Sequence, residues 1–525
     1  MTKNKILIVG AGPTGLMMAC QLAIRKIPFR IIDKNEDHTT QSRALVIHAR
    51  SLEIFEQLGI AQEAVQLGKK AKAVNLFVNG KRRLQFNLNN IGEGLTQFPF
   101  LLILEQSKTE KLLNGFINRH GFFVERNTEL IDFSQNNNQI NASLKQADKE
   151  QESIEVNWMI GADGANSLVR RKLNIPFAGK TYKESLFVLD CEMTMDIPPD
   201  EMCICFSDKT FAGLFPMTNG RSRVIGIVPD EFQGNDSINF ENATKDFAKR
   251  TRLNIILKNP QWISMYHSHH RSVSSFQQGH CFLAGDAAHI HSPVGAQGMN
   301  TGLQDAYNLA WKLALIIKEN AKESLLDSYN DERIVIAQNL VKTTDRVFHI
   351  VTSKKKLFAF FRLYFMPTFM KLVLPIAQRI SFIRRSAFKS ISEIGLHYRY
   401  SKLSIDNNKS SFPNKAPRPG DRVPYLPEVQ TMLSDAKFHL LIFMGEQKDQ
   451  QTNQAIQMFI EKYNELISVH EIKLTEATKT MYKKFGITKQ GCYFIRPDNY
   501  IAYRSNSLQL QQLTDYIEGN ILTKK

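Results

Sequence analysis

The sequence has 525 residues, of which 43% are hydrophobic and 22% charged, and this balance excludes a disordered chain and predicts two to four domains with cores of their own. Its six cysteines include no CxxC pair, which argues against a disulfide scaffold and a dithiol or zinc motif. The first residues carry no signal-peptide pattern, and no run of about 18 uncharged apolar residues occurs, so we expect a cytoplasmic protein without a membrane-spanning helix.

The first predicted elements are a strand, a glycine turn, a helix and a second strand, in KILIVGAGPTGLMMACQLAIRKIPFRIIDK (5–34). Three glycines fill the GxGxxG positions, where they allow a tight turn, the approach of a pyrophosphate to the backbone, and close packing of helix on strand. An acid ends the second strand, where it can bind ribose hydroxyls. The stretch predicts a bound dinucleotide without distinguishing NAD from FAD. The positions expected to contact it are Gly10, Gly12, Pro13, Thr14, Gly15, Asp33 and Lys34.

The middle of the chain alternates apolar and polar residues in LFVLDCEMTM, MCICFS and RVIGIVP, between residues 185 and 229, which predicts β-strands. A histidine-rich run, HSHHR (267–271), follows on an extended stretch. His267 and His269 would share one face there without an acidic partner, so we expect no metal site. The later pair His289 and His291 also lacks a ligand set, and a structural or cofactor-side role is expected for it.

Next comes LAGDAAHIHSPVGAQGMN (283–300), an apolar run that ends in the acid Asp286 and continues with Gly, Ala and Pro. Small residues leave the backbone N–H groups accessible, so that a flat ligand can lie against the chain and accept hydrogen bonds from them. An ordinary glycine-rich loop, however, has the same composition. The spacing of Leu303, Ala306, Ala310 and Leu313 predicts a helix after it. Because the chain has no second GxGxxG, one dinucleotide is held permanently and a nicotinamide coenzyme would bind without its own Rossmann domain.

A basic and aromatic stretch follows, with eleven Lys and Arg against one Glu between Val351 and Lys402. Two interpretations are open. Residues 353–385 could lie on a membrane surface as an amphipathic helix, or the helix could bury its apolar face on its own protein and leave the lysines in water. Pro367 and Pro375 are expected to interrupt a long helix. A nucleic-acid partner is not expected, because no recognisable nucleic-acid-binding motif accompanies these basic residues.

The final hundred residues predict a small α/β unit. FHLLIFMG indicates a strand, NQAIQMFIEKYN a helix, GCYFIRPDNYIAYR two strands joined by a turn, and LQQLTDYIEG a last helix. No CxxC follows the first of these strands, so the unit is expected to lack redox activity and to serve in packing or in a homodimer contact.

Two further stretches extend the glycine motif into a family resemblance. WMIGADGANSLVRRKL (158–173) and CFLAGDAAHIHSPVGAQGMNTGLQDAYNLAWKL (281–313) resemble the DG and GD motifs of single-component (class A) FAD-dependent aromatic monooxygenases, the group of para-hydroxybenzoate hydroxylase and phenol hydroxylase. GAGPTG (10–15) completes the three fingerprints in their usual order. APRPGDRVPYL (416–426) resembles the start of the C-terminal thioredoxin-like extension in the phenol hydroxylase branch.

This resemblance implies an α/β fold in which a Rossmann-type FAD-binding domain is split between residues 1–175 and 276–350. A β-sheet substrate domain (176–275) is inserted between the two parts. A basic helical segment (351–415) and a thioredoxin-like domain (416–525) follow.

The resemblance also implies roles for single residues. Asp286 would bind the ribityl chain of FAD, and the helix after the GD loop would aim its N-terminus at the flavin and stabilise its reduced, anionic form. Asp163 and Arg170 are associated with FAD and nicotinamide phosphates. Phe215 and Pro216, with Pro293, are the substrate-pocket candidates. The implied FAD contacts outside the first motif are Arg43, Gln106, Asp163, Gly285, Asp286, Pro293, Gly295, Gln297, Gly298, Met299 and Asn300.

The implied reaction consumes NADPH or NADH and O2, forms a flavin C4a-hydroperoxide, and hydroxylates a phenolic or polyketide-like small molecule. No metal and no side-chain nucleophile are expected. Three alternatives are open: a membrane-surface flavin monooxygenase with a lipophilic, non-phenolic substrate; a flavin halogenase or reductase on the same scaffold; and a non-catalytic FAD-binding protein.

Overall fold

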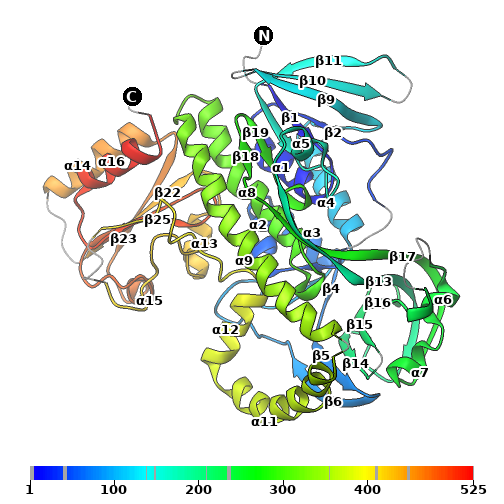
Figure 1. Cartoon of the computed structure of the whole chain (residues 1–525). Helices are drawn as coiled ribbons and strands as arrows, with labels where there is room; N and C mark the ends of the chain where they lie inside the picture. The colour runs from blue at the N-terminus through cyan, green and yellow to red at the C-terminus, as the bar shows by residue number, and fades with distance from the viewer. Residues whose placement is uncertain are drawn as a thin grey trace.

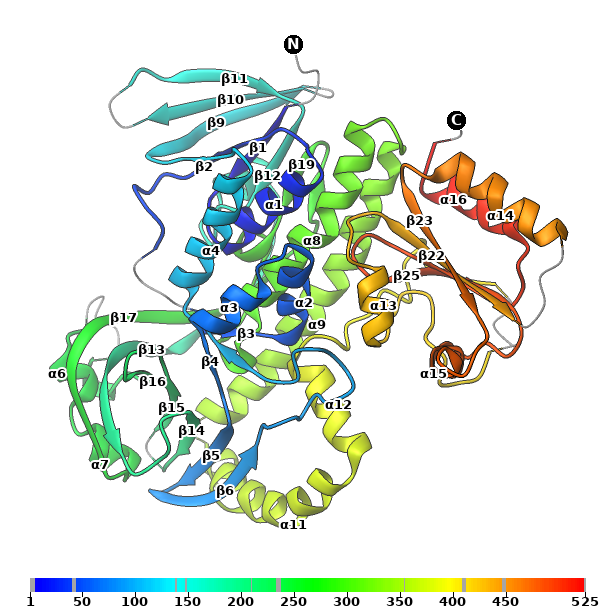
Figure 2. The same cartoon turned by 180° about the vertical axis from the view of Figure 1, so that it is seen from behind.

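The computed structural model of the chain describes residues 5–39, 44–136, 139–146, 149–208, 210–232, 238–353, 355–407, 412–445 and 450–523. Figures 1 and 2 show a central α/β unit near the N-terminus, a second sheet below it on one side, and a C-terminal α/β unit on the other. Among these residues no helix combines the length and apolarity needed to cross a bilayer.

The central unit is built on a six-stranded sheet with the order β18-β19-β12-β1-β2-β8. Its strands are β1 (Ile6–Val9), β2 (Arg30–Ile32), β8 (Val124–Glu125), β12 (Trp158–Gly161), β18 (Gln277–Gln278) and β19 (Cys281–Leu283). All pairings are parallel except that of β18 with β19. The central strands β1, β12 and β19 are short, apolar and fully buried, as parallel strands covered on both faces are. Because β18 and β19 follow β13 to β17 of the second sheet in sequence, the chain returns to complete the first one.

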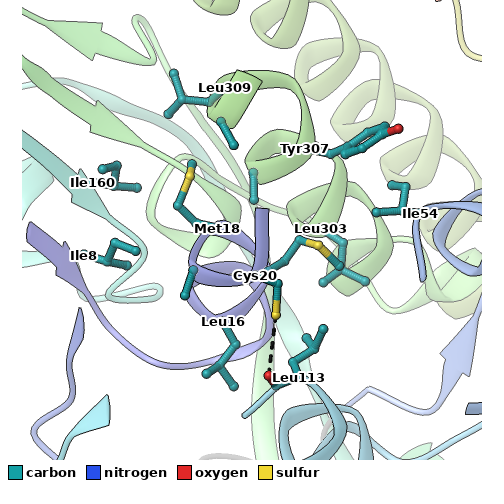
Figure 3. Packing of buried hydrophobic residues seen from close by; sticks show 14 of the residues in the cluster. Ile8, Leu16, Met18, Cys20, Ile54, Leu113, Ile160, Leu303, Tyr307 and Leu309 are labelled. Atoms are coloured by element: carbon teal, nitrogen blue, oxygen red, sulfur yellow. Dashed lines mark hydrogen bonds between the residues drawn. The ribbon is translucent and has the colours of Figure 1, made fainter. Parts of the chain in front are cut away.

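Long helices cover this sheet. They are α1 (Pro13–Ile24), α4 (Gln106–Arg119), α8 (Gly298–Ile317) and α9 (Asp327–Thr352), of which α8 includes the predicted helix. Figure 3 shows α1 enclosed by the strands, through Ile8 and Ile160, and by α8, through Leu303. On its other side Cys20 donates a hydrogen bond to the carbonyl of Leu113 in α4 over 3.5 Å. The glycine turn at the start of α1 is therefore held from three directions.

The second sheet has eight strands in the order β20-β17-β13-β16-β15-β14-β5-β6. They are β5 (Ala73–Val78), β6 (Lys81–Asn87), β13 (Phe177–Met195), β14 (Glu201–Phe206), β15 (Phe211–Pro216), β16 (Arg221–Ile227), β17 (Ile255–Val273) and β20 (His289–Ile290). The predicted strands between residues 185 and 229 are found here, and the run 267–271 lies in β17. The hairpin β5–β6 also joins this sheet, although it comes from the range predicted as FAD-binding domain alone.

Smaller elements fill the edges. Two three-stranded sheets, ordered β11-β10-β9 and β3-β7-β4, flank the central unit. Their strands are β3 (Val46–Ile47), β4 (Lys69–Lys70), β7 (Leu102–Ile103), β9 (Thr128–Asn136), β10 (Gln139–Gln146) and β11 (Glu152–Val156). The short helices are α2 (Ala49–Gln57), α3 (Ala61–Leu67), α5 (Leu168–Lys172), α6 (Phe240–Thr244) and α7 (Phe247–Thr251).

The basic stretch is helical, as predicted. It forms α10 (Lys356–Phe360), a π-helical turn η5 (Phe361–Phe365), α11 (Met366–Arg379) and α12 (Ser381–Ile391). The expected interruption at Pro375 is wrong, because α11 continues past it to Arg379. Pro367 does not end the helix either, because the helical run continues through it from η5 into α11. The π-helical turn lies just before Pro367, where the helix lacks an N–H donor.

The C-terminal unit contains every predicted element in the predicted order, on a sheet ordered β21-β25-β24-β22-β23. Its elements are β21 (Ile405–Asp406), α13 (Pro427–Met432), β22 (Phe438–Gly445), α14 (Gln450–Tyr463), β23 (Ile467–Lys473), α15 (Lys479–Phe485), β24 (Gly491–Ile495), β25 (Ile501–Ser505) and α16 (Leu510–Asn520). Its specific likeness to thioredoxin stays a prediction.

A buried cluster of charges joins the C-terminal unit to α8 and α9. Arg496 donates to both carboxylate oxygens of Glu332, over 2.6 and 2.9 Å, and also to Asp498. Lys312 lies 3.0 Å from the same Glu332 carboxylate, and these side chains are almost fully buried. Burial by itself would raise the pKa of Glu332, but the charges of Arg496 and Lys312 hold that pKa well below its usual range.

Candidate active site

A cavity of about 580 Å³ opens at the carboxyl ends of β1, β2 and β12, where a ligand of a parallel α/β sheet is expected. Asp33 stands at the end of β2, and its carboxylate accepts hydrogen bonds from the backbone N–H groups of Ala11, over 2.7 Å, and Asn35, over 2.9 Å. Lys34 is exposed on the cavity wall. The acid predicted to bind ribose is thus fixed beside the glycine turn.

The three glycines of the turn have different surroundings. A Cβ on Gly10 would lie 2.4 Å from the carbonyl oxygen of Ala162, and one on Gly15 would lie 1.9 Å from the carbonyl oxygen of Gly10. Both positions therefore require glycine for packing. A Cβ on Gly12 would meet no atom within 4 Å, and Gly12 lines the cavity. Open space over bare backbone at the N-terminus of α1 fits a pyrophosphate.

A second cavity, of about 380 Å³, continues from the first. Both are lined by Gly12, Gln106, Ala162 and Gly164, so together they form one elongated cleft. Pro13 and Thr14 at the start of α1 also line the second cavity, which lies between the segment 284–299 and strands β15 and β16. An elongated cleft with a polar phosphate end and a more apolar far end suits FAD, whose ring must lie against backbone.

Backbone packing and a buried ion pair hold the GD segment in place. Gly285, with φ +61°, has no room for a side chain, because its Cβ would lie 2.5 Å from the hydroxyl of Thr14. The carboxylate of Asp305 accepts from the N–H of Gly285 over 2.9 Å, and it lies 2.8 Å from His289 and 2.6 Å from Arg333. Asp286 is thereby presented at the wall of the second cavity.

Among the predicted loop contacts, Pro293, Gln297, Gly298 and Met299 line the second cavity. Gly295 and Asn300 shape the loop instead. The side-chain oxygen of Asn300 accepts from the N–H of His48 over 2.9 Å, and its amide donates to the carbonyl of Val46 over 2.9 Å. Gly295 adopts φ +81°, a conformation that favours glycine.

The remaining predicted cofactor contacts differ in their placement. Gln106 lines both cavities, and its side chain bonds to the N–H of Ala44 and to Glu110. Asp163 lines the first cavity and accepts from the N–H of Leu168 over 2.7 Å at the start of α5. Burial raises the pKa of Asp163, and its second carboxylate oxygen is buried without a hydrogen-bond partner among the described residues.

Arg170 and Arg43 complete the predicted phosphate contacts. Arg170 donates to the carbonyl oxygens of Ala287, over 2.8 Å, and Ala165, over 2.7 Å, and it lies over the ring of Phe177. It therefore ties the DG segment to the GD segment and lines neither cavity. Arg43 lies outside the described residues.

The substrate side of the second cavity is formed by strands β15 and β16. Phe215 lines the cavity as predicted, whereas Pro216 is buried beside it and does not. Arg223, which was not among the predicted site residues, also lines the cavity and donates to both oxygens of Asp190 over 2.7 and 2.6 Å. Its side chain is fully buried, so the paired charge faces the cavity from the protein interior.

His291 is a second polar group in this wall. Its Nδ1 lies 2.8 Å from the carbonyl oxygen of Ser292 and therefore carries the proton of the neutral ring. Its Nε2 is buried and has no hydrogen-bond partner among the described residues. Burial lowers the pKa of His291 to about 4, so Nε2 is an acceptor at neutral pH. The described residues hold no cluster of His, Cys, Asp and Glu suited to a metal ion.

Comparison with known proteins agrees with this geometry. Residues 3–344 match the model of the family described as an FAD binding domain. The chain belongs to this FAD-binding family. A 6-methylpretetramide 4-monooxygenase from Streptomyces rimosus is 30% identical over 98% of this chain and 93% of its own length. A pentachlorophenol 4-monooxygenase from Sphingobium chlorophenolicum is 32% identical over 67% of this chain and 65% of its own.

Solved structures support the fold over the whole length. The flavin-dependent monooxygenase PieE, solved with FAD and substrate, superposes with a TM-score of 0.81 at 18% identity and covers 99% of both chains. Aklavinone-11 hydroxylase, solved with FAD and aklavinone, gives a TM-score of 0.78 at 20% identity and covers 99% of both chains. The chain is an FAD-dependent monooxygenase, and the predicted family and cofactor are confirmed.

Proposed function

We propose that this monooxygenase hydroxylates a phenolic or polyketide-like aromatic molecule bound in the second cavity. In the balanced reaction one atom of O2 enters a ring C–H bond as a hydroxyl group, and the other leaves as water with two electrons from NADPH or NADH. FAD, when bound, supplies the redox chemistry. The glycine turn and Asp33 would hold its phosphates and ribose, and the segment 293–299 would hold its ring.

The observation that carries the proposal is the combination, in this cavity, of apolar walls with the side chains of Arg223 and His291. Phe215 and Ile225 offer apolar surface to an aromatic ring and exclude water. The Nε2 atom of His291 accepts the hydrogen bond of a phenolic hydroxyl, which orients the ring. The guanidinium of Arg223, fixed by Asp190, favours negative charge on the ring oxygen.

The relatives support the same class of substrate. A protein named for 6-methylpretetramide covers nearly the whole chain, and one named for pentachlorophenol covers two thirds of it. An aromatic hydroxylase from angucycline biosynthesis shares the fold at a TM-score of 0.76. We infer a phenol of one to four fused rings as the substrate range to screen first.

The test is nicotinamide oxidation in air by the flavin-loaded protein, with and without each member of a panel of phenols and polycyclic phenols. A true substrate is expected to accelerate oxidation and to yield a product that carries one atom from 18O2. Parallel assays with NADH and NADPH identify the reductant. If no aromatic compound stimulates nicotinamide oxidation although flavin is bound, the proposed aromatic substrate class is wrong, and non-phenolic compounds become the substrates to test.

A further inference from the structure

A helical arm, defined here as residues 355–391 with α10, η5, α11 and α12, projects from the end of the molecule opposite both chain termini (Figures 1 and 2). Its inner side is anchored. Leu363 and Met366 pack against a cluster with Val78 and Phe206, and Phe388 is buried in the main core. The inner side of the arm is therefore packed as part of the fold, but these contacts do not cover its outer side.

The outer side of the arm is apolar. Of the twenty large hydrophobic side chains exposed in the described chain, twelve lie in these 37 residues, a concentration that singly scattered surface residues do not produce. They are Leu357, Phe360, Phe361, Tyr364, Phe365, Phe369, Leu372, Val373, Ile380, Phe382, Ile383 and Ile391. Leu357, Leu372 and Phe382 are 76%, 69% and 77% exposed.

Three of these side chains, Phe361, Phe365 and Phe369, form an aromatic ridge along the helix. The ring of Phe361 stacks on that of Phe365 at 5.3 Å between centroids, and Phe365 stacks on Phe369 at 5.8 Å. The spacing of four residues places all three on one face of the helix. A ridge of stacked rings in water is unfavourable unless another apolar phase covers it.

The charge of the arm indicates what that phase is. Residues 355–391 contain eight Lys and Arg and no Asp or Glu. Lys355, Lys356, Lys371, Arg385 and Lys389 are exposed, whereas Arg362 is turned inward onto the carbonyl of Ser353. Helices with an aromatic and aliphatic face flanked by lysine and arginine lie in the interface of anionic bilayers.

A second copy of the chain fits less well on the same surface. In a twofold dimer the arm would meet itself, and its uncompensated positive charges would face one another. An anionic lipid surface instead pairs with those charges and covers the rings. No helix of the described chain can span a bilayer, so the contact is a peripheral one.

We propose that the arm docks the protein on an anionic membrane surface, with its aromatic ridge inserted among the lipids and its lysines on the phosphate groups. The end of α12 lies beside the active site, because Gln297, which lines the second cavity, donates to the carbonyl of Ser390 over 3.4 Å. Docking therefore brings the substrate cavity close to lipid.

The experiment is vesicle flotation of the full-length, flavin-loaded protein. Vesicles of phosphatidylcholine and phosphatidylglycerol in equal parts are compared with vesicles of phosphatidylcholine alone. We expect binding to the anionic vesicles only, and a strong decrease when salt is raised, because salt screens the lysine–phosphate attraction. The assay needs no substrate, so its outcome is independent of the proposed reaction.

Two sets of variants test the two components of the surface. F365S/F369S/L372S removes the ridge and is expected to weaken binding by about a hundredfold or more. K355Q/K356Q/K371Q removes three exposed charges and is expected to weaken it by about tenfold or more. All six side chains are exposed, so folding and flavin content should be unchanged.

Matched controls alter equivalent groups elsewhere on the surface. F123S/I256S/M458S removes three apolar side chains that are 67%, 60% and 64% exposed, and K111Q/K322Q/K473Q removes three exposed lysines. Both controls should bind as the unaltered protein does. The proposal is overturned if that protein does not float with anionic vesicles, or if arm and control variants behave alike. It is also overturned if sedimentation reveals a dimer that F365S/F369S/L372S dissociates, because a second copy then covers the ridge.

Discussion

His291 lines the substrate cavity, and its buried Nε2 atom has no hydrogen-bond partner among the described residues, which leads to a prediction about binding. His291→Ala removes the acceptor and should raise the KM for a phenolic substrate about five- to tenfold, the value of one neutral hydrogen bond, with a smaller change in kcat. His291→Gln keeps an acceptor and should restore much of the loss. Steady-state kinetics with the best substrate of the screen measures both.

The pH dependence follows from the direction of the pKa shift. The pKa of His291 is lowered by burial to about 4, so the ring is neutral and remains an acceptor from about pH 5 to 8. Between these pH values the KM of the unaltered protein should therefore show no change caused by titration of His291, and its pH profile should match that of His291→Gln. A step near the ordinary histidine pKa that disappears in His291→Gln would contradict a buried, neutral ring.

The Arg223–Asp190 pair can be tested by separating stability from function. Arg223→Met leaves the Asp190 carboxylate buried without its partner and should cost about 3–5 kcal/mol in the free energy of unfolding. D190L/R223M replaces both charges with apolar groups and should recover most of that stability. It should not recover substrate-stimulated oxidation, because the positive charge at the cavity is gone. Thermal unfolding and the oxidation assay report the two effects separately.

At the scale of elements, the glycine turn offers a paired prediction for cofactor binding. Gly12→Ala adds a methyl group that meets no protein atom within 4 Å, so the protein should fold and yet lose most of its FAD, because the methyl group occupies the phosphate site. Gly10→Ala places a Cβ 2.4 Å from a backbone oxygen at φ +99°, so the fold itself should be destabilised. Flavin absorbance and circular dichroism of the two purified variants distinguish the effects. A folded Gly12→Ala protein with full flavin content would contradict the assignment of the phosphate site.

Elements with a strong local signal were predictable from sequence. The strand–turn–helix of residues 5–34, the helix after the GD loop, and the strands and helices of the C-terminal unit all appear where their periodicity indicated them. The hairpin β5–β6 was not assigned to the second sheet, although Asn79-Gly80 is a turn signal, because its pairing with β14 is a contact between residues far apart in the chain. Pro375 did not end α11, since tertiary context can override a local helix breaker.

Among the polar groups of the site, those in sequence motifs were predictable and those outside motifs were not. Gly12, Asp33 and Gln297 were identified because they belong to motifs with fixed spacing. Arg223 lies on an ordinary alternating strand, and nothing in its neighbourhood marks it as facing a cavity. Asn300 stands within a motif but makes its side-chain hydrogen bonds inside the protein, which only three-dimensional packing reveals.

At the scale of the whole molecule, the buried charge cluster couples the C-terminal unit to α8 and α9. Arg496→Met leaves Glu332 and Asp498 without their main partner and should cost about 3–5 kcal/mol. The two units should then unfold in separate calorimetric steps. Arg504→Met, which breaks a pair with Asp406 inside the C-terminal unit, is the matched control and should leave the units coupled. A single transition in Arg496→Met would show that the cluster is not what joins them.

The return of the chain to complete its first sheet has a consequence for how the protein is made on the ribosome. Strand β19, at residues 281–283, closes against β12, and the segment 284–299 supplies one wall of the second cavity. Residues 1–175 therefore emerge during synthesis as an open sheet that lacks β18 and β19 and one wall of its ligand site. The intervening strands β13 to β17 can pair among themselves first, because domains tend to fold as they emerge. Capture of the flavin is consequently a late event, which follows the folding of the sheet inserted in the middle.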